Sequence, residues 1–162
     1  MDIDTTSVIT RKLFPGRFYD AFFIGEYGRI EATRATRYNT CFSLIVIGID
    51  GAGNGLPLES VEGLEFLKKL VDKVLASVRS CDIAGLSQNG RIMVILPETD
   101  YFGALIASKK LSRALTPAAK EASRHKVLLS SATFQRDGRT FAEMAAAAEK
   151  RVIERAVSLW EK

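Results

Sequence analysis

The sequence predicts an α+β fold, an α/β sandwich in which a central, mostly antiparallel sheet is flanked by helices. Apolar runs of strand length alternate with longer segments whose apolar residues recur at helical spacing. An Asn-Gly pair separates two of the strand-like runs, which is a hairpin signal. After a first helix, the expected order is strand, helix, strand, strand, helix, strand. That order is the split β-α-β pattern of ferredoxin-like domains.

The first half of the chain supplies two helices and a strand. Residues 1–13 show no strong periodicity, whereas apolar residues at helical spacing predict a helix from about Arg17 to Arg37. The continuous apolar run Cys41–Ile49 is typical of a strand buried on both faces, so we expect it centrally in the sheet. A glycine-rich loop over residues 51–57 precedes a helix marked by the apolar residues from Leu64 to Val78.

A hairpin and a third helix follow. The runs Ile83–Ser87 and Arg91–Leu96 flank Gln88-Asn89-Gly90, where both Asn89 and Gly90 tolerate positive φ, so we expect a tight antiparallel turn. Thr99 or Asp100 can cap the next helix. We expect Thr116-Pro117 to interrupt or end it, because proline lacks the helical N–H donor.

The last part of the chain predicts a strand and a final helix. Lys126–Phe134 has strand character, and Gln135–Gly138 is a turn. Thr140 followed by Glu143 forms a capping box that opens an alanine-rich helix reaching about Trp160.

Composition limits the class of protein. With 162 residues, 47% hydrophobic and 26% charged, the chain is expected to form a single globular domain over 1–162, with a core of about 14–157. The longest apolar run is too short to cross a bilayer, and the acidic N-terminus lacks a secretory layout, so we expect a cytoplasmic protein without a membrane partner. The net charge of +4 is scattered along the chain, and no nucleic-acid polymer is expected as a partner.

Neither the cysteines nor the histidine suggests a catalytic or metal site. Cys41 and Cys81 border predicted strands without metal-like clustering, so we interpret them as reduced packing residues. His125, the single histidine, has no nearby nucleophile or ligand pattern. The sequence gives no reason to expect a cofactor, and it does not support a hydrolase.

The most informative segment is Arg79-Ser80-Cys81-Asp82, followed after five residues by Gln88–Ile92 and an apolar strand ending at Pro97. This layout resembles the GGDEF family of diguanylate cyclases, in which an Arg-x-x-Asp element precedes the signature turn by the same interval. Arg79 lies nine positions before Gln88, as the family register requires. The resemblance extends from about Phe14 to Val157 and implies the nucleotidyl-cyclase palm form of the fold.

The same register implies that the signature is degenerate. It places five residues on the family motif: Gln88, Asn89, Gly90, Arg91 and Ile92. In the family, the two acids now replaced by Gly90 and Arg91 hold Mg²⁺, and Gly48 stands where another metal-binding aspartate is usual. Because Mg²⁺ needs several oxygen ligands, we expect no cyclase activity, no catalytic residues and no metal site.

The Arg-x-x-Asp element is the product-binding site of the family, and the resemblance implies that it can bind cyclic di-GMP. Arg79 could fork onto a phosphate or a guanine edge, while Asp82 could accept the guanine donors. The alternative is an exposed arginine at a helix end with a local turn or surface ion pair. Further contacts could come from other arginines of the chain: Arg11, Arg34, Arg37 and Arg113.

These observations leave three hypotheses. The leading one is a catalytically inactive GGDEF-like signalling domain that binds cyclic di-GMP through Arg79 and Asp82. The second is a ligand-independent module for protein interaction or homodimer formation. The third, a noncanonical enzyme acting on GTP, would need Asp50 and additional acids to assemble a metal site.

Overall fold

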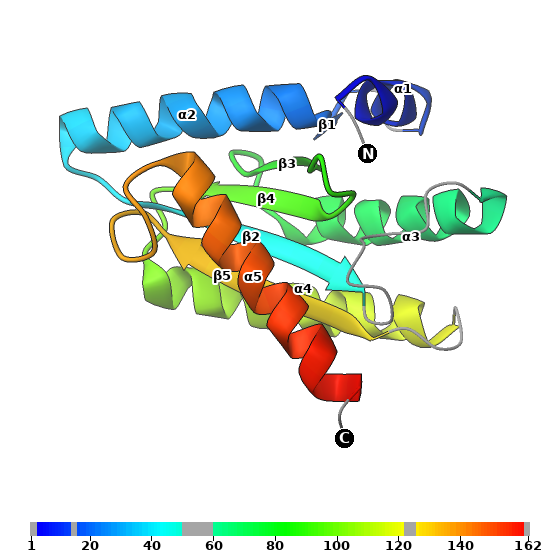
Figure 1. Ribbon diagram of the computed structural model, residues 1–162. Coiled ribbons are helices and arrows are strands. Elements are labelled where there is room, and N and C mark those ends of the chain that lie inside the picture. Colours follow the sequence, from blue (N-terminus) through cyan, green and yellow to red (C-terminus); the bar gives the residue numbers. More distant parts are fainter. Residues whose placement is uncertain (1–2, 14–15, 50–59, 122–125, 161–162) are drawn as a thin grey trace.

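The computed structural model describes residues 3–13, 16–49, 60–121 and 126–160. Helices and strands alternate along the chain much as expected (Figure 1). In chain order they are α1 (Ile3–Leu13), β1 (Phe18–Tyr19), α2 (Ala21–Tyr38), β2 (Phe42–Ile49), α3 (Val61–Ser77), β3 (Ile83–Leu86), β4 (Ile92–Pro97), α4 (Tyr101–Glu121), β5 (Val127–Thr133) and α5 (Phe141–Trp160). The predicted loop over 51–57 lies outside the described residues. Within the described chain, no helix combines the length and apolar character needed to cross a membrane.

The strands form one mixed sheet in the order β1-β3-β4-β2-β5. β2 pairs antiparallel with both β4 and β5, β3 pairs antiparallel with β4, and β1 joins β3 in parallel at the edge. Without β1, the remaining order is that of a ferredoxin-like sheet. The predicted α+β fold and the internal position of the 42–49 strand are therefore confirmed.

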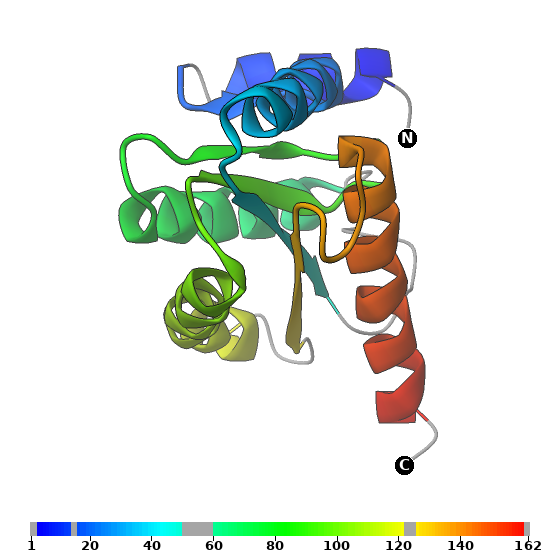
Figure 2. The ribbon, with the colours of Figure 1, turned by 90° about the vertical axis from the view of Figure 1, so that its left-hand side faces the viewer.

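Two helices cover each face of the sheet, and alternating side chains of β2 fill both interfaces. Ile45 and Ile47 face α3 and α4, whereas Leu44 and Val46 face α2 and α5. Figure 2 shows this layering, with the sheet between the two helix pairs. These β2 residues are at most 1% exposed, and burial of each stabilises the fold by about 1.5–3 kcal/mol.

The N-terminal part differs from the prediction. Residues 3–13 form a helix, and the predicted helix from Arg17 begins only at Ala21, because Phe18 and Tyr19 pair with β3. The Asp20 side chain caps α2 by accepting the Phe23 N–H at 2.9 Å. The expectation of a helix over residues 17–20 was wrong, since pairing with a sheet edge overrides local helical spacing.

Pro117 does not end its helix. α4 continues to Glu121, so the predicted interruption at Thr116-Pro117 is wrong. Pro117 is on the exposed side of the helix, while Leu115 and Ala119 on the opposite side are buried against the core. Packing of the last turn therefore offsets the cost of an internal proline, which is about 3 kcal/mol.

The hairpin between β3 and β4 is confirmed, but its turn is built differently from an Asn-Gly pair with two positive φ angles. Gly90 N–H donates to the Ser87 carbonyl at 3.0 Å, and Ser87 N–H donates to the Arg91 carbonyl at 2.7 Å. Of the turn residues, Gly90 has a positive φ of 75° and Asn89 does not. The geometry is that of a three-residue loop that ends in a left-handed glycine.

The capping box of α5 is also confirmed with one change. The Thr140 hydroxyl accepts the Glu143 N–H at 3.1 Å. The Glu143 carboxylate reaches back to the Arg139 N–H at 2.8 Å, one residue earlier than the usual partner. The turn predicted over residues 135–138 is present before this helix.

Candidate functional site

Arg79 and Asp82 lie together where α3 gives way to β3. The Asp82 carboxylate accepts the Arg79 backbone N–H at 2.8 Å and the guanidinium Nη2 at 2.8 Å, with Nε at 3.2 Å. The Asp82 N–H in turn donates to the Arg79 carbonyl at 3.1 Å. The Arg-x-x-Asp spacing thus closes a turn in which one carboxylate fixes both the backbone and the side chain of the arginine.

The Arg79 side chain also reaches the end of β4. Its Nη2 donates to the Pro97 carbonyl at 3.2 Å and to the Thr99 hydroxyl at 3.0 Å. The Asp82 side chain is 3% exposed, whereas the Arg79 side chain is 55% exposed. The hydrogen bond to Asp82 raises the pKa of Arg79 above its ordinary value, so the guanidinium stays charged. The arrangement presents a fixed cation to solvent.

A cavity of about 510 Å³ adjoins this cation. Its walls include Arg79 and Asp82 on one side and residues of α4, among them Ile106 and Lys110, on the other. Cys41 also lines it, and burial raises the pKa of the Cys41 thiol. A cavity of this volume with an apolar wall and a few polar groups has the character of a small-molecule site.

The cavity contains a cation that sequence reasoning missed and lacks those it suggested. Lys110 lines it, whereas Arg11, Arg34, Arg37 and Arg113 do not. Arg34 instead pairs with Glu31 of its own helix at 2.9 Å. Helical spacing offered a signal for Lys110, because it lies one turn beyond Ile106 on α4. Its place in the cavity depends on the packing of α4 beside the Arg79 turn.

The signature turn occupies a different place, against α5. Arg91 Nη1 contacts Glu149 Oε2 at 2.6 Å, and the Asn89 side-chain amide donates to the same oxygen at 3.3 Å. The Arg91 and Glu149 side chains are 5% and 11% exposed. Nothing in the sequence marked this pair, because its partners are far apart in the chain.

Gly48 lies beside Arg91, and the family register puts both residues on metal-binding positions. A Cβ atom built on Gly48 would stand 3.6 Å from Arg91 Nε and 2.6 Å from Val152 Cγ1. The two positions therefore face each other across neighbouring strands. In this chain they carry a glycine and a buried arginine.

The described residues around Gly48 offer few ligands for a divalent metal ion. Mg²⁺ takes oxygen ligands, whereas Arg91 brings a guanidinium that is bound to Glu149 Oε2. Across the described parts of the chain, no group of three or more His, Cys, Asp or Glu side chains is placed to hold a metal. Asp50, the remaining acid of interest, lies outside the described residues.

Comparison with solved structures identifies the fold. The chain resembles the FimX GGDEF domain from Pseudomonas aeruginosa with a TM-score of 0.70 and 10% identity, covering 87% of this chain and 90% of that one. It also resembles the GGDEF domain of DgcB from Caulobacter crescentus, solved in complex with c-di-GMP, with a TM-score of 0.68 and 11% identity over 82% and 81% of the two chains. The chain has the GGDEF-domain fold. The family resemblance inferred from the Arg79 register is thereby supported as to fold.

A third similar structure belongs to a chain that is longer than this domain. The diguanylate cyclase SiaD from Pseudomonas aeruginosa, solved with its activator SiaC, matches with a TM-score of 0.65 and 17% identity over 85% of this chain. The match covers 54% of the SiaD chain, so the GGDEF-like chain spans about half of that protein. No family model matches the chain, and no curated protein matches its sequence.

Proposed function

We propose that this GGDEF-like chain is a signalling domain that binds cyclic di-GMP at the Arg79 corner and does not synthesise it. The observation that carries the proposal is the Arg79 guanidinium, which is fixed by Asp82 and Thr99 while more than half of its side chain remains exposed beside the cavity. The structure of DgcB with c-di-GMP supports it by showing that a domain of this fold can hold the ligand.

Arg79 supplies the anion-binding group in this proposal. A guanidinium has five N–H donors, and the intramolecular bonds described above use Nε and Nη2. The Nη1 amino group is left for a phosphate oxygen or the acceptor edge of guanine. Because the side chain is already oriented, binding costs little additional ordering.

Asp82 acts mainly as a positioning residue for Arg79. Its carboxylate is almost wholly buried and accepts from the arginine backbone and side chain. Lys110, on the opposite wall, provides a second positive charge for a ligand with two phosphates. Glu98 and Asp100 also line the cavity, so the two positive groups that favour a dianion, Arg79 and Lys110, lie among acidic side chains.

The proposed lack of cyclase activity rests on Arg91. A cyclase needs metal ions that bridge the attacking hydroxyl and the triphosphate. Arg91 is held by Glu149 within the fold, beside the Gly48 position, and a fixed guanidinium cannot coordinate both reacting oxygens. Incubation with GTP and either Mg²⁺ or Mn²⁺ should therefore yield no cyclic di-GMP. Turnover that disappears in Asp50→Asn would establish the noncanonical enzyme instead.

Isothermal titration calorimetry tests the binding branch. Cyclic di-GMP should bind the unmodified chain with a dissociation constant in the micromolar range, and Arg79→Ala should abolish the heat signal. Arg113→Ala is the matched control, because this arginine is exposed on α4 and does not line the cavity. Absence of binding to the unmodified chain, or equal binding to Arg79→Ala, would refute the site.

A second candidate function is protein interaction or dimerisation, favoured by an apolar patch on α4. Phe102 and Ile106 are each 71% exposed and Leu105 is 37% exposed, beside the Arg79 cavity. Helical spacing places them on one side of α4. If sedimentation shows a ligand-free dimer that Ile106→Ser dissociates, while calorimetry shows no nucleotide binding, this function replaces the receptor.

A further inference from the structure

A second cavity, of about 570 Å³, lies between α2 and α5 on the opposite face of the sheet from α3 and α4. α2 lines it over residues 21–36, which corresponds to roughly 22 Å of helix at 1.5 Å per residue. Met93 of β4 and Phe141 and Ala145 of α5 also contribute. Figure 1 shows α5 starting beside α2 and diverging from it across the sheet.

Two glycines of α2 differ in their surroundings. At Gly28, an added Cβ would stand 2.4 Å from the Phe141 ring, so the close contact between α2 and α5 requires a glycine there. At Gly25, which lines the cavity, no heavy atom lies within 4 Å of an added Cβ. A glycine inside a helix costs about 0.5–1 kcal/mol relative to alanine. Gly25 is exposed, so the space over it is open to solvent, and a larger side chain there would narrow the groove.

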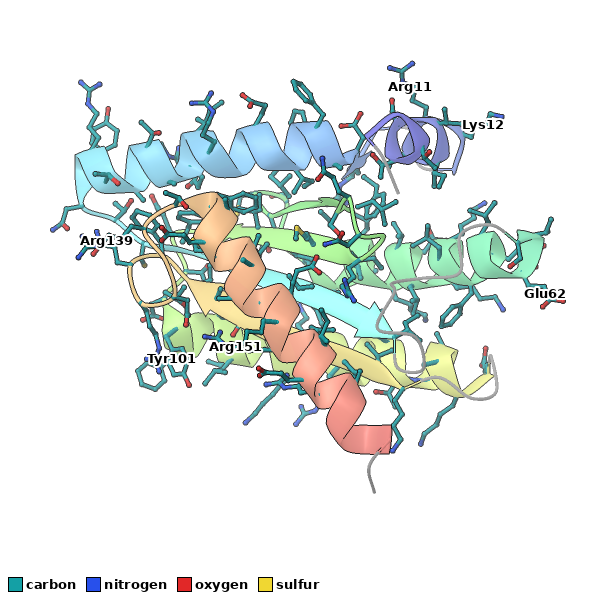
Figure 3. All side chains as sticks on the ribbon, in the orientation of Figure 1. Arg11, Lys12, Glu62, Tyr101, Arg139 and Arg151 are labelled. Atoms are coloured by element: carbon teal, nitrogen blue, oxygen red, sulfur yellow. The ribbon has the colours of Figure 1, made fainter. Side chains whose placement is uncertain are left out.

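The charged residues that line the groove are both arginines, Arg29 and Arg139. Arg29 pairs with Glu26 at 3.1 Å, but both side chains are largely exposed, so this pair is weak and can be exchanged. Arg139 is exposed just before α5, and Figure 3 shows it near the C-terminal end of α2. An apolar, elongated groove that carries only positive lining charges is complementary to an amphipathic anion.

We propose that the α2–α5 groove binds a medium-chain alkyl carboxylate, with the chain over Gly25 and Met93 and the carboxylate at Arg139. The cavity lies within the usual volume of small-molecule sites. The α2 wall is more than long enough for an extended ten-carbon chain, and the arginine fork matches a carboxylate. The site is separate from the Arg79 cavity and does not depend on cyclic di-GMP.

Titration with decanoate, followed in amide NMR spectra of the full chain, tests this site. Saturable shifts should centre on Gly25, Met93 and Ala142, with submillimolar affinity. Decyltrimethylammonium, which has the same chain and the opposite charge, should bind at least tenfold more weakly. Shifts centred on the exposed α4 patch of Phe102 and Ile106, or equal affinity for the cation, would overturn the proposal.

Variants separate the groove from general apolar binding. Gly25→Leu fills the hollow and should weaken decanoate at least tenfold without lowering the melting temperature, because it also removes a helix-interior glycine. Ala142→Leu, on the facing helix, should act in the same direction. Arg139→Gln should weaken decanoate at least fivefold, whereas Arg113→Gln should leave it unchanged. Unaltered decanoate binding in both leucine variants would refute the site.

Discussion

Two arginine–carboxylate pairs of this GGDEF-like chain have the same chemistry and opposite surroundings. Arg91 and Glu149 are both buried, whereas Arg79 is 55% exposed above a buried Asp82. In the buried pair, Glu149 Oε2 meets Arg91 while Glu149 Oε1 has no hydrogen-bond partner, and removing either residue leaves an uncompensated charge. An exposed guanidinium on a buried carboxylate keeps its orientation and can still meet a ligand. On this contrast rests the proposal that one pair is structural and that the other binds a ligand.

The largest expected effect comes from breaking the buried pair. Glu149→Ala strands the Arg91 charge and should lower the free energy of unfolding by about 3–5 kcal/mol. Thermal or urea unfolding measures it. Glu154→Ala on the same helix is the control, since its contact with Lys150 is 3.9 Å long and exposed, and the expected loss is below about 1 kcal/mol. Equal losses would show that burial does not distinguish the pairs.

Next in size is the loss of the positioning carboxylate. Asp82→Ala leaves the Arg79 N–H and guanidinium without their acceptor and should cost about 1–3 kcal/mol of stability. Cyclic di-GMP binding should fall together with it, because the arginine is no longer oriented. Calorimetry and urea unfolding on the same sample give both values. Full binding by a stable Asp82→Ala protein would remove Asp82 from the site.

A third pair, of intermediate exposure, sharpens the comparison through its pH dependence. Asp137 accepts from Arg151 and from the Thr133 N–H. The Asp137 side chain is 10% exposed, and the Arg151 side chain is 40% exposed. Burial alone would raise the pKa of Asp137, but the hydrogen bonds from Arg151 and Thr133 outweigh it and leave the pKa below its ordinary value.

The sign of the effect follows from that lowered pKa. A carboxyl with a lower pKa in the folded state stabilises the protein above its unfolded pKa, near pH 4, and loses this contribution as the pH falls through the folded value. Unfolding free energies at pH 7 and pH 3 should therefore differ less in Asp137→Asn than in the unmodified chain. An unchanged difference would contradict the assignment.

A smaller stability effect than that of Glu149→Ala should come from Arg79 itself. Arg79→Ala removes the guanidinium donors of the buried Asp82 carboxylate but keeps the residue-79 N–H, so it should lower the free energy of unfolding by about 1–3 kcal/mol while it abolishes ligand binding. Thermal unfolding beside calorimetry separates the two effects. A loss as large as that of Glu149→Ala would make Arg79 a structural residue and remove the contrast.

The sheet and its covering helices could be predicted because their signals are local. Buried strands appear as continuous apolar runs, and the helices show one apolar side each. α1 was missed because its buried positions include Thr6 and Thr10, whose polar side chains do not register as an apolar stripe. The Thr6 hydroxyl accepts the Ala21 N–H at 3.2 Å, which is a tertiary contact.

The residues of the candidate site were predictable only where their spacing along the chain is local. The Arg79–Asp82 spacing is local, so sequence register found the pair. Lys110 and Glu149 reach their sites only through the fold, from helices packed against opposite faces of the sheet. Pro117 shows the reverse case, in which a strong local signal yields to the packing of Leu115 and Ala119.

Arginine side-chain NMR during a cyclic di-GMP titration tests the contrast most directly. Both guanidinium groups are observed in the same sample, so each serves as the control for the other. The Nε–H signal of Arg79 should shift and saturate while that of Arg91 stays in place. A titration in which Arg91 responds, or in which Arg79 does not, would contradict it.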